Sequence, residues 1–499
     1  MLYPVKKIIS NLLLIFILIG VSCSKDLTND NDEFNPNLDT DDLEVNLEGD
    51  LQISDFIWKG LNEFYYWQEE VSELSDEMLN DEKEYAEYIN NNSNPELFFE
   101  SLKHPDDRFS WIQDNYVELE NTLQGVFATN GVEFGLLYAC ENCNEVVGFV
   151  KYILEGSNAD GRNIKRGDFF NGVNGMTLND SNYISLLFGE NLSYTLNMAS
   201  VENGRVISNG VNVELTKEEN FKTNPIQVNK IFNIDDGKQV GYLMYNQFVA
   251  DKSEDLNDIF GLFNNENIND LIIDLRYNGG GSVKNCVELA SMITGQFKSE
   301  VFAEEQWNKK LVSYLEERFG SESLINRFVD TLSNGIQINS LNLDRVYMIT
   351  SSESASASEL LINGLSSYIE VIQIGERTVG KNVGSITVYD YIDNEQTKNP
   401  DHTYAMQPIV LKMANSDGYA DYTDGLEPNR LIEEDITKLG VLGVLGEPLL
   451  TSTLNLISGT KKLSPLKPII NREFLIIDPN MLIRQNMIIE KNFNYFEPK

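Results

Sequence analysis

Two short stretches of this sequence combine residue types that could carry out nucleophilic chemistry. Residues 350–361 read TSSESASASELL, a serine-rich run of small residues that leads into an apolar helical pattern, and residues 374–381 read IGERTVGK. A serine hydroxyl attacks a carbonyl efficiently only when a base lies next to it, and a neutral lysine amine can be that base. A serine of the first stretch and Lys381 of the second are therefore candidates, although serine-rich turns before helices are also common as plain helix caps.

A third stretch could bind the negative charge that such a reaction develops. Residues 272–281 read IIDLRYNGGG, an apolar strand pattern that runs into three glycines. Glycine lets the backbone approach a ligand closely because it has no side chain beyond Cα. The start of a helix also favours negative charge, since its first N–H groups have no carbonyl partner within the helix.

Together the three stretches resemble the C-terminal processing (tail-specific) serine peptidases, whose marks are a DLRxNxGG strand, a SASASE turn and a GExTxGK turn in this order. In that family the middle serine of SASASE attacks and the lysine lies 25 residues downstream; Ser356 and Lys381 have this spacing. The resemblance covers about Leu51 to Gly459, and residues 421–428 look like the family's late strand. It implies a serine endopeptidase that works through a Ser356–Lys381 dyad and an acyl-enzyme.

The chemistry of this dyad sets physical requirements. Lowering a lysine pKa from ~10.4 to ~7.5 costs about 4 kcal/mol, which burial normally supplies, and the neighbours of Lys381 are small and uncharged. The resemblance implies that the N–H of Ala357 and a glycine N–H, that of Gly280, bind the oxyanion. Arg276 and Asp274 are expected to brace the glycine turn.

One position departs from the family pattern. The family often has a glutamine four residues after the lysine, where it orients the amine, and this chain has Ser385. A hydroxyl could still hold the amine, so we predict Ser385 as the third catalytic position. A Ser-His-Asp triad is the alternative, and His104 and His402 are the two histidines of the chain.

The region around these stretches alternates strand and helix patterns. Short apolar runs at 241–245, 271–275, 346–350 and 371–374 are separated by helical patterns at 255–263, 282–293, 307–319 and 358–365. Such alternation predicts parallel βαβ units with helices on the faces of the sheet. The fold class expected is α/β and multidomain: an N-terminal helical segment, a PDZ-like β-rich domain and a Ser-Lys peptidase core of the ClpP/crotonase-like type.

Upstream of the core, residues 125–199 are rich in strand and turn patterns and resemble a PDZ domain of the bacterial protease type. Strands are expected at 132–138 and 146–153, a hairpin turn at Asn174-Gly175, and a helix with Ile184, Leu187 and Phe188 on its apolar face. The resemblance implies binding of extended peptides, with apolar C-termini, beside residues 132–138. A small β-domain without a ligand is the alternative.

The first residues carry the pattern of an export signal. Lys6 and Lys7 precede an apolar run of eight residues, too short to span a bilayer. The run ends at Val-Ser-Cys, which resembles a bacterial lipobox with Cys23 as the lipidated residue; a plain cleaved signal is the alternative. We expect a Bacteroidetes-type lipoprotein of the cell envelope, in the outer membrane and facing the periplasm or the cell surface.

Composition restricts the partners. The chain has 38 Lys and Arg against 78 Asp and Glu, a formal net charge of −40. This charge argues against nucleic acid as a partner, and protein or peptide substrates are expected. No cofactor is expected, and no metal site, because two histidines and scattered cysteines offer no ligand pattern. Cys140 and Cys143 form a CxxC pair between two predicted strands, for which a hairpin disulfide, two free thiols or a redox role are possible.

The sequence therefore predicts the following parts: a signal peptide (1–22), an acidic disordered tether (23–50), an N-terminal helical domain (51–112), a PDZ-like domain (120–220), the peptidase core (225–460) and an extension without an assigned role (461–499). Besides the peptidase, two other functions fit the same fold. One is a catalytically inactive relative that binds peptides through its PDZ-like groove, and the other is a carrier of hydrophobic small molecules.

Overall fold

The computed structural model describes residues 49–234, 237–393, 395–459, 475–476, 485 and 487–490. Residues 1–48, which hold the predicted signal, Cys23 and nearly all of the acidic tether, lie outside the described residues. Within the described ranges, no helix is both long and apolar enough to cross a bilayer.

The N-terminal part is helical, as the sequence predicts. It contains α1 (Asp50–Phe64), α2 (Glu82–Asn90), α3 (Pro95–Ser101), β1 (Trp111–Gln113) and α4 (Tyr116–Leu123), with short 3₁₀ turns at Gln68–Glu70, Ser72–Leu74 and Asp76–Asn80. Apolar residues at helical spacing give α1 a buried face. Pro95 opens α3, where its missing N–H costs nothing, and the Asn94 side chain accepts the Leu97 N–H at 2.9 Å.

The β-rich part follows directly. Its elements are β2 (Val126–Thr129), β3 (Val132–Tyr138), β4 (Val146–Ile153), β5 (Phe169–Val173), β6 (Met176–Thr177), the short helix η4 (Ile184–Phe188), β7 (Ser193–Glu202), β8 (Arg205–Thr216) and β9 (Glu218–Lys222). The predicted strands at 132–138 and 146–153 are confirmed with the same bounds and pair antiparallel. Asn174 and Gly175 have φ of 53° and 80°, the conformation of a two-residue hairpin turn.

Two further predictions for this part concern its helix and its cysteine pair. The predicted helix is the single five-residue turn η4, in which Ile184 is 51% exposed and Leu187 is buried. A helix this short presents only a narrow apolar face. Cys140 and Cys143 lie in the turn between β3 and β4 as free thiols, and the Cys143 thiol lies 3.0 Å from the carbonyl oxygen of Cys140.

The main sheet of the core has the order β10-β11-β12-β16-β17-β22. Its strands are β10 (Ile226–Asn233), β11 (Gln239–Tyr245), β12 (Asp270–Asp274), β16 (Arg345–Thr350), β17 (Glu370–Gly375) and β22 (Arg430–Leu431). The strands from β11 to β22 are parallel, and β10 is an antiparallel edge. The prediction of parallel βαβ units is confirmed, as is the α/β multidomain fold class.

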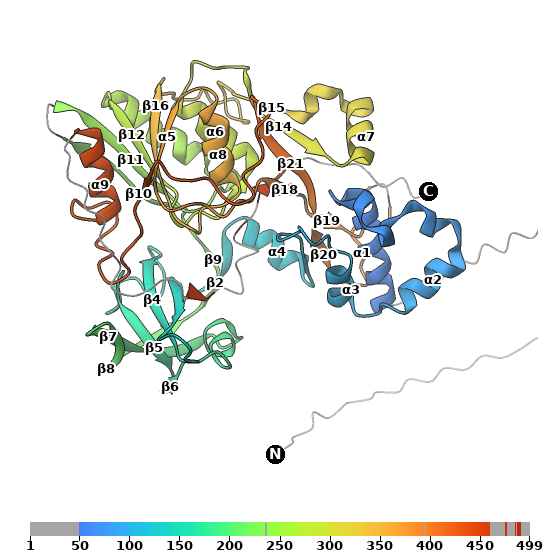
Figure 1. Ribbon diagram of the computed structural model, residues 1–499, viewed down its shortest axis with the longest axis horizontal. Helices are drawn as coiled ribbons and strands as arrows, with labels where there is room; N and C mark the ends of the chain where they lie inside the picture. The colour runs from blue at the N-terminus through green and yellow to red at the C-terminus, as the bar shows by residue number, and fades with distance from the viewer. Residues whose placement is uncertain are drawn as a thin grey trace, which may run out of the picture. The chain divides into compact units, whose positions relative to one another are not determined.

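Helices cover both faces of this sheet (Figure 1). α5 (Ser253–Asn265), α6 (Val283–Ile293) and α8 (Ala357–Ser366) pack on one face, and α9 (Pro448–Ile457) packs on the other. Because both faces are buried, the strands are continuous apolar runs, as parallel strands usually are. This explains why the runs were recognisable in the sequence.

A second sheet has the order β13-β24-β18-β21-β14-β15. Its strands are β13 (Gly281–Ser282), β24 (Met487–Ile488), β18 (Val383–Ser385), β21 (Ile409–Asn415), β14 (Val301–Trp307) and β15 (Ile325–Arg327). The remaining elements are α7 (Lys309–Phe319), the 3₁₀ turns Ala250–Lys252 and Ser321–Leu324, β19 (Val388–Tyr389), β20 (Ala405–Gln407) and β23 (Leu475–Ile476). This sheet brings the glycine turn and the lysine turn to the two sides of β24.

The expected late strand at residues 421–428 is not a strand. The chain there runs through turns, and the strand begins only at Arg430. Gly425 has a φ of +91° and Pro428 has no N–H to donate to a neighbouring strand. Both features prevent regular pairing before residue 430.

Candidate active site

The three chemically suggestive stretches follow neighbouring parallel strands. The glycine turn follows β12, the serine turn follows β16 and the lysine turn follows β17. Because the carboxyl ends of parallel strands meet at one edge of the sheet, the turns converge there, which is where α/β proteins usually place their sites. The convergence is held by hydrogen bonds: Ala355 N–H donates to the Asn278 carbonyl at 3.1 Å, and Val379 N–H donates to the Ser354 carbonyl at 3.0 Å.

Ser356 lies at the N-terminus of α8 in a strained conformation. Its φ is +62°, in the left-handed region, which costs a residue with a side chain about 1–2 kcal/mol. Its side chain is fully buried, and its Oγ has no hydrogen-bond partner among the described residues. A buried hydroxyl without a partner is unfavourable, and strain of this kind is concentrated at functional sites.

The two flanking serines are arranged differently. The Ser354 hydroxyl donates to the Leu275 carbonyl at 2.8 Å, and the Ser358 hydroxyl donates to the Asn278 carbonyl at 3.0 Å. Both hydroxyls therefore fasten the serine turn to the glycine turn. Of these three serines, Ser356 alone has a hydroxyl that is not engaged.

Lys381 is buried, and it follows Gly380. Any other residue in place of this glycine would force the neighbouring backbone to move. Gly380 has a φ of +88°, and a Cβ there would lie 2.1 Å from the Thr423 carbonyl oxygen. The Lys381 side chain is 1% exposed, and its burial lowers the pKa of the amine to about 7, against the opposing effect of Asp107 and Glu359. The amine is thus held where its neutral form is populated near neutral pH.

Glu359 connects the serine turn to the lysine turn, and the sequence analysis gave it no role. Its Oε2 accepts the backbone N–H groups of Ser356 and Lys381, each at 2.8 Å. Its Oε1 accepts the Gly380 N–H at 2.6 Å and the Thr378 hydroxyl. Burial raises the pKa of this carboxyl, and the four hydrogen bonds oppose that shift. The spacing of Ser356 and Glu359 is that of a capping box, which is the signal that could have revealed the carboxylate.

The N-terminal helical part also contributes to the lysine pocket. The Lys381 amine lies 5.0 Å from the centre of the Phe109 ring. Arg108 donates to the carbonyls of Gly380 and Thr423, both at 2.9 Å, and so holds the lysine turn. Nothing local in the sequence shows that residues 107–109 fold back onto the site.

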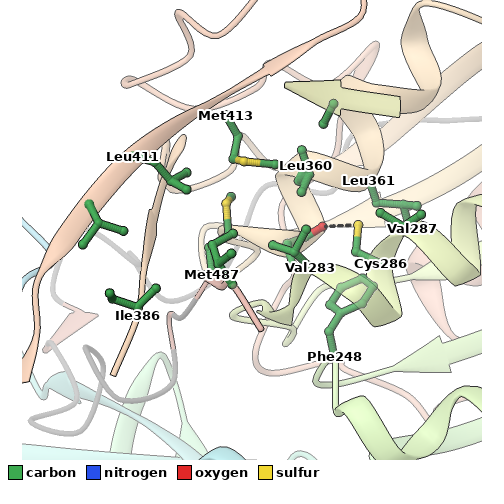
Figure 2. Close-up of a cluster of buried hydrophobic side chains, with 14 of the residues drawn as sticks. Phe248, Val283, Cys286, Val287, Leu360, Leu361, Ile386, Leu411, Met413 and Met487 are labelled. Atoms are coloured by element: carbon green, nitrogen blue, oxygen red, sulfur yellow. Dashed lines mark hydrogen bonds between the residues drawn. The ribbon is translucent and has the colours of Figure 1, made fainter. Parts of the chain in front are cut away.

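The two predicted oxyanion donors lie at the expected turns, but the N–H of Gly280 already donates a hydrogen bond within its own turn. Ala357 is the first residue of α8, where backbone N–H groups lack an intrahelical partner. Its carbonyl accepts the Cys286 thiol at 3.3 Å, the dashed line in Figure 2. The Gly280 N–H donates to Asn278 Oδ1 at 2.8 Å, so in this state it does not point freely into the site.

The hydroxyl of the predicted third position, Ser385, and the lysine amine have different hydrogen-bond partners. The Ser385 side chain is buried, and its hydroxyl lies 3.4 Å from the carbonyl oxygen of Met487. The amine of Lys381 donates instead to the carbonyl oxygen of Gln485, at 2.5 Å. A backbone carbonyl therefore holds the amine in this structure.

The two histidines are engaged elsewhere. His104 stacks on Trp67 with an angle of 3° between the rings. His402 Nε2 lies 2.9 Å from Asp390 Oδ2. Since Ser356 Oγ has no hydrogen-bond partner in the described part of the chain, neither histidine serves as its base here.

A buried ion-pair network connects the glycine turn to the β-rich part. Arg276 is fully buried and pairs with Asp274, Glu434 and Glu447 at 2.6–2.7 Å. Arg166, which precedes β5, pairs with the same Glu434 oxygen at 2.7 Å. Glu434 is buried, but the two guanidinium groups lower its pKa to about 2. The expectation that Arg276 and Asp274 brace the turn agrees with these contacts.

A cavity of about 260 Å³ lies beside the glycine turn. Its lining includes Gly279 and Tyr277 from that turn, Asn246 from the loop after β11, and Glu133 and Tyr152 from the β-rich part. The cavity therefore opens where the β-rich part and the core meet. A polypeptide chain bound there would pass directly beside the glycines.

The sequence of the chain matches two family models. The model of Peptidase family S41 matches residues 239–405, and the model of the Peptidase S41 N-terminal domain matches residues 52–111. A curated relative, carboxyl-terminal-processing peptidase 3 of the chloroplast of Arabidopsis thaliana, is 27% identical over 244 residues. The match covers 47% of this chain and spans 43% of the length of that relative.

A solved structure shares the fold. A Bacteroides fragilis protein assigned to the S41 proteases superposes with a TM-score of 0.62 at 22% identity, over 82% of this chain and 98% of that chain. The photosystem II D1 C-terminal processing protease gives a TM-score of 0.48 at 17% identity, over 81% and 98% of the two chains. The two matched sequence models and the shared fold agree with the arrangement of the three turns. The chain belongs to peptidase family S41.

Proposed function

We propose that this protein is a serine endopeptidase in which Ser356 is the nucleophile and Lys381 is the general base. One observation carries the proposal: the hydroxyl of Ser356 is buried and unengaged at the N-terminus of α8, while Glu359 fixes its backbone to that of a buried lysine. Burial lowers the pKa of this lysine to about 7, which suits a general base at neutral pH.

In the proposed reaction, the neutral Lys381 amine takes the proton from Ser356 as Oγ attacks the carbonyl carbon of the scissile peptide bond. The resulting oxyanion accepts hydrogen bonds from the N–H of Ala357 and from the glycine turn, where Gly280 must release Asn278 to take part. The ammonium group then returns the proton to the leaving amine, and an acyl-enzyme remains. Water, deprotonated by the same amine, hydrolyses the acyl-enzyme.

The β-rich part is proposed to recruit the substrate. In the described part of the chain, β3 lies at the edge of the sheet formed by β3, β4, β5, β7 and β8. Part of this edge is covered by β23, which pairs antiparallel with β3 through Leu475 and Ile476. Strand addition of this kind is how PDZ domains bind peptides. We therefore assign protein tails or unfolded polypeptides as substrates, bound as an added strand beside β3.

Covalent labelling tests the assignment directly. A fluorophosphonate probe should label the purified protein, and a Ser356→Ala variant should be neither labelled nor active on denatured casein. The variant should keep its melting temperature within a few degrees. Casein turnover by a folded Ser356→Ala protein would exclude Ser356 as the nucleophile.

A catalytically inactive peptide-binding protein is the second candidate. It is favoured by the position of Ser385, whose hydroxyl lies beside Met487 and not beside the lysine amine. Under this function the fluorophosphonate probe would leave Ser356 unlabelled in every variant, while peptides would still bind to the β-rich part. The same experiment thus separates the two candidates.

We also propose that the protein is an exported lipoprotein anchored through Cys23. The support is the sequence alone: a short apolar run after two lysines, followed by Val-Ser-Cys and an acidic stretch. The wild-type protein should partition with membranes, and a Cys23→Ser protein should not. Wild-type protein found wholly in the exported soluble fraction, with another N-terminal residue, would contradict the anchor and leave the peptidase proposal unaffected.

A further inference from the structure

Residues 485 and 487–490, which we call the late segment, lie inside the candidate active site. β24 pairs parallel with β13 through Gly281 and Ser282, and with β18 through Ser385. β13 carries the end of the glycine turn, and β18 follows the lysine turn. The late segment therefore fills the position of a strand between the turn of the proposed oxyanion donor and the turn of the proposed base.

The backbone of the late segment engages the reactive groups. The Gln485 carbonyl accepts the Lys381 amine at 2.5 Å, and the Ile489 N–H donates to the Ser385 carbonyl at 3.2 Å. With its amine directed to this carbonyl, Lys381 is not hydrogen-bonded to Ser356, whose Oγ has no partner in the described residues. The geometry is that of a site in which the nucleophile and its base are not connected.

Side chains of the late segment anchor it at alternate positions. Met487 and Ile489 are buried, and both belong to the main apolar cluster of the core. Figure 2 shows the Met487 side chain among Val283, Ile386 and Leu411. Alternate side chains entering pockets while the main chain pairs is the pattern of a bound strand.

A second described part of the C-terminal region, residues 475–476, pairs with the β-rich part. Leu475 and Ile476 pair with Leu137 and Leu136 of β3, the strand beside which substrates are proposed to bind. Nine positions later in the sequence, Gln485 contacts the catalytic lysine. Two described parts of the chain, residues 475–476 and the late segment, thus lie beside the recruiting strand and beside the proposed reactive groups.

We propose that the late segment is an intramolecular inhibitor that occupies the substrate channel between β13 and β18. This inference rests on the proposed function, because it takes Lys381 and Ser356 as the working groups. It also defines the ligand of the channel: an extended polypeptide with apolar side chains at two alternate positions, in the places of Met487 and Ile489.

A comparison of three chains tests the inhibitor. They end at residues 484, 490 and 499, so that the chain ending at 490 is the matched control, which keeps the late segment. A tethered segment competes at an effective concentration on the order of 1 mM, so removing it should raise kcat/KM for denatured casein about tenfold or more. The chains ending at 490 and 499 should have equal, low activity. A synthetic peptide of residues 482–492 should inhibit the shortest chain competitively.

The opposite result would show that the late segment completes the site. If the chain ending at 484 is folded, as judged by circular dichroism, but has equal or lower activity, the inhibitor proposal is wrong. If that chain does not fold, the full chain with Met487→Ser and Ile489→Ser decides in its place, with Ile488→Ser as the control. Raised activity in the double variant supports the proposal, and unchanged or lowered activity overturns it.

Fluorophosphonate labelling separates failure of this proposal from failure of the proposed function. Under the inhibitor proposal, labelling of Ser356 is slow in the full chain and fast in the chain ending at 484. Equal labelling of both chains leaves Ser356 as the nucleophile and removes the inhibitor. Absence of labelling in every chain contradicts the peptidase assignment, and the inhibitor with it.

Discussion

The backbone N–H groups of Ser356 and Lys381, 25 positions apart in the sequence, donate to one and the same oxygen atom, Oε2 of Glu359. This shared acceptor fixes the strand-to-helix turn of the proposed nucleophile relative to the turn of the proposed base. The carboxylate is buried and accepts four hydrogen bonds in all. It therefore fixes the backbones of the two proposed catalytic residues, and its charge also acts on the lysine.

Glu359→Gln should lower kcat/KM by about two orders of magnitude. The amide nitrogen of glutamine is a hydrogen-bond donor, whereas the carboxylate oxygen it replaces is an acceptor. It would therefore face two of the four donor groups without being able to accept their hydrogen bonds. Glu359 also raises the pKa of Lys381 through its charge, so the acid limb of the pH–rate profile should move to lower pH in the variant. Steady-state kinetics between pH 5 and 9 measures both effects.

The control for this variant is Glu316→Gln, a change of the same kind on the exposed face of α7, which should leave both the rate and the pH profile unchanged. A loss of rate in Glu359→Gln without a shift of the acid limb would mean that the carboxylate is only structural.

Alanine at each of Ser354, Ser356 and Ser358 in the serine turn should lower activity to a different extent. Ser356→Ala should abolish activity, because the only unengaged hydroxyl of the three is lost. Ser354→Ala and Ser358→Ala should reduce kcat/KM about twofold to thirteenfold, since each removes one hydrogen bond that fastens the turn and a net hydrogen bond is worth about 0.5–1.5 kcal/mol. Complete loss in Ser354→Ala, with the fold intact, would contradict the choice of the middle serine.

The parts of the fold that could be predicted are those fixed by local patterns. The strand bounds at 132–138 and 146–153 and the turn at Asn174 follow from alternation and turn chemistry, and the buried strands of the core follow from continuous apolar runs. The late strand at 421–428 could not be rejected from the sequence, because a short run with a glycine and a proline fits either a strand edge or a turn.

The parts of the site that could not be predicted depend on contacts between distant segments. Phe109 and Gln485 are 272 positions before and 104 positions after Lys381, and neither lies in a motif. Glu359 lies within the serine-rich motif, and its spacing from Ser356 is that of a capping box. This spacing is the local signal from which its hydrogen bond to Ser356 could have been predicted. Ser385 stays a prediction, with a contact to Met487 that the sequence did not suggest.

Phe109→Ala should move the acid limb of the pH–rate profile to higher pH. Activity is expected to rise with pH as Lys381 loses its proton, with a midpoint near pH 7 in the wild type, because burial lowers the pKa of the amine to about 7. Removing the Phe109 ring admits water to the amine and weakens that burial, so the pKa rises toward the ordinary lysine value. Phe109→Leu, which keeps an apolar wall, should shift the profile less. An unchanged midpoint in Phe109→Ala would show that the ring does not control the protonation of Lys381.

Lys381→Met should make the folded protein more stable at pH 7 while abolishing activity. The folded pKa of Lys381, about 7, lies below its unfolded value of 10.5, so between these two pH values the unfolded chain binds more protons than the folded chain. Stability therefore rises with pH in this window, and at pH 7 nearly all of the cost of burying the amine is still present. Each unit of lowered pKa corresponds to about 1.36 kcal/mol, so the variant should gain a few kcal/mol at pH 7 and progressively less toward pH 10.5.

Urea unfolding at pH 7 and pH 9.5 measures that difference. Lys83→Met, at an exposed position of α2, is the control and should show no such change between the two pH values. A Lys381→Met protein that is less stable than the wild type at pH 7, with the same dependence on pH, would mean that the amine is charged in the folded state. In that case the hydrogen bond to Gln485 would outweigh burial, and Lys381 could not act as the base near neutral pH while the late segment is bound.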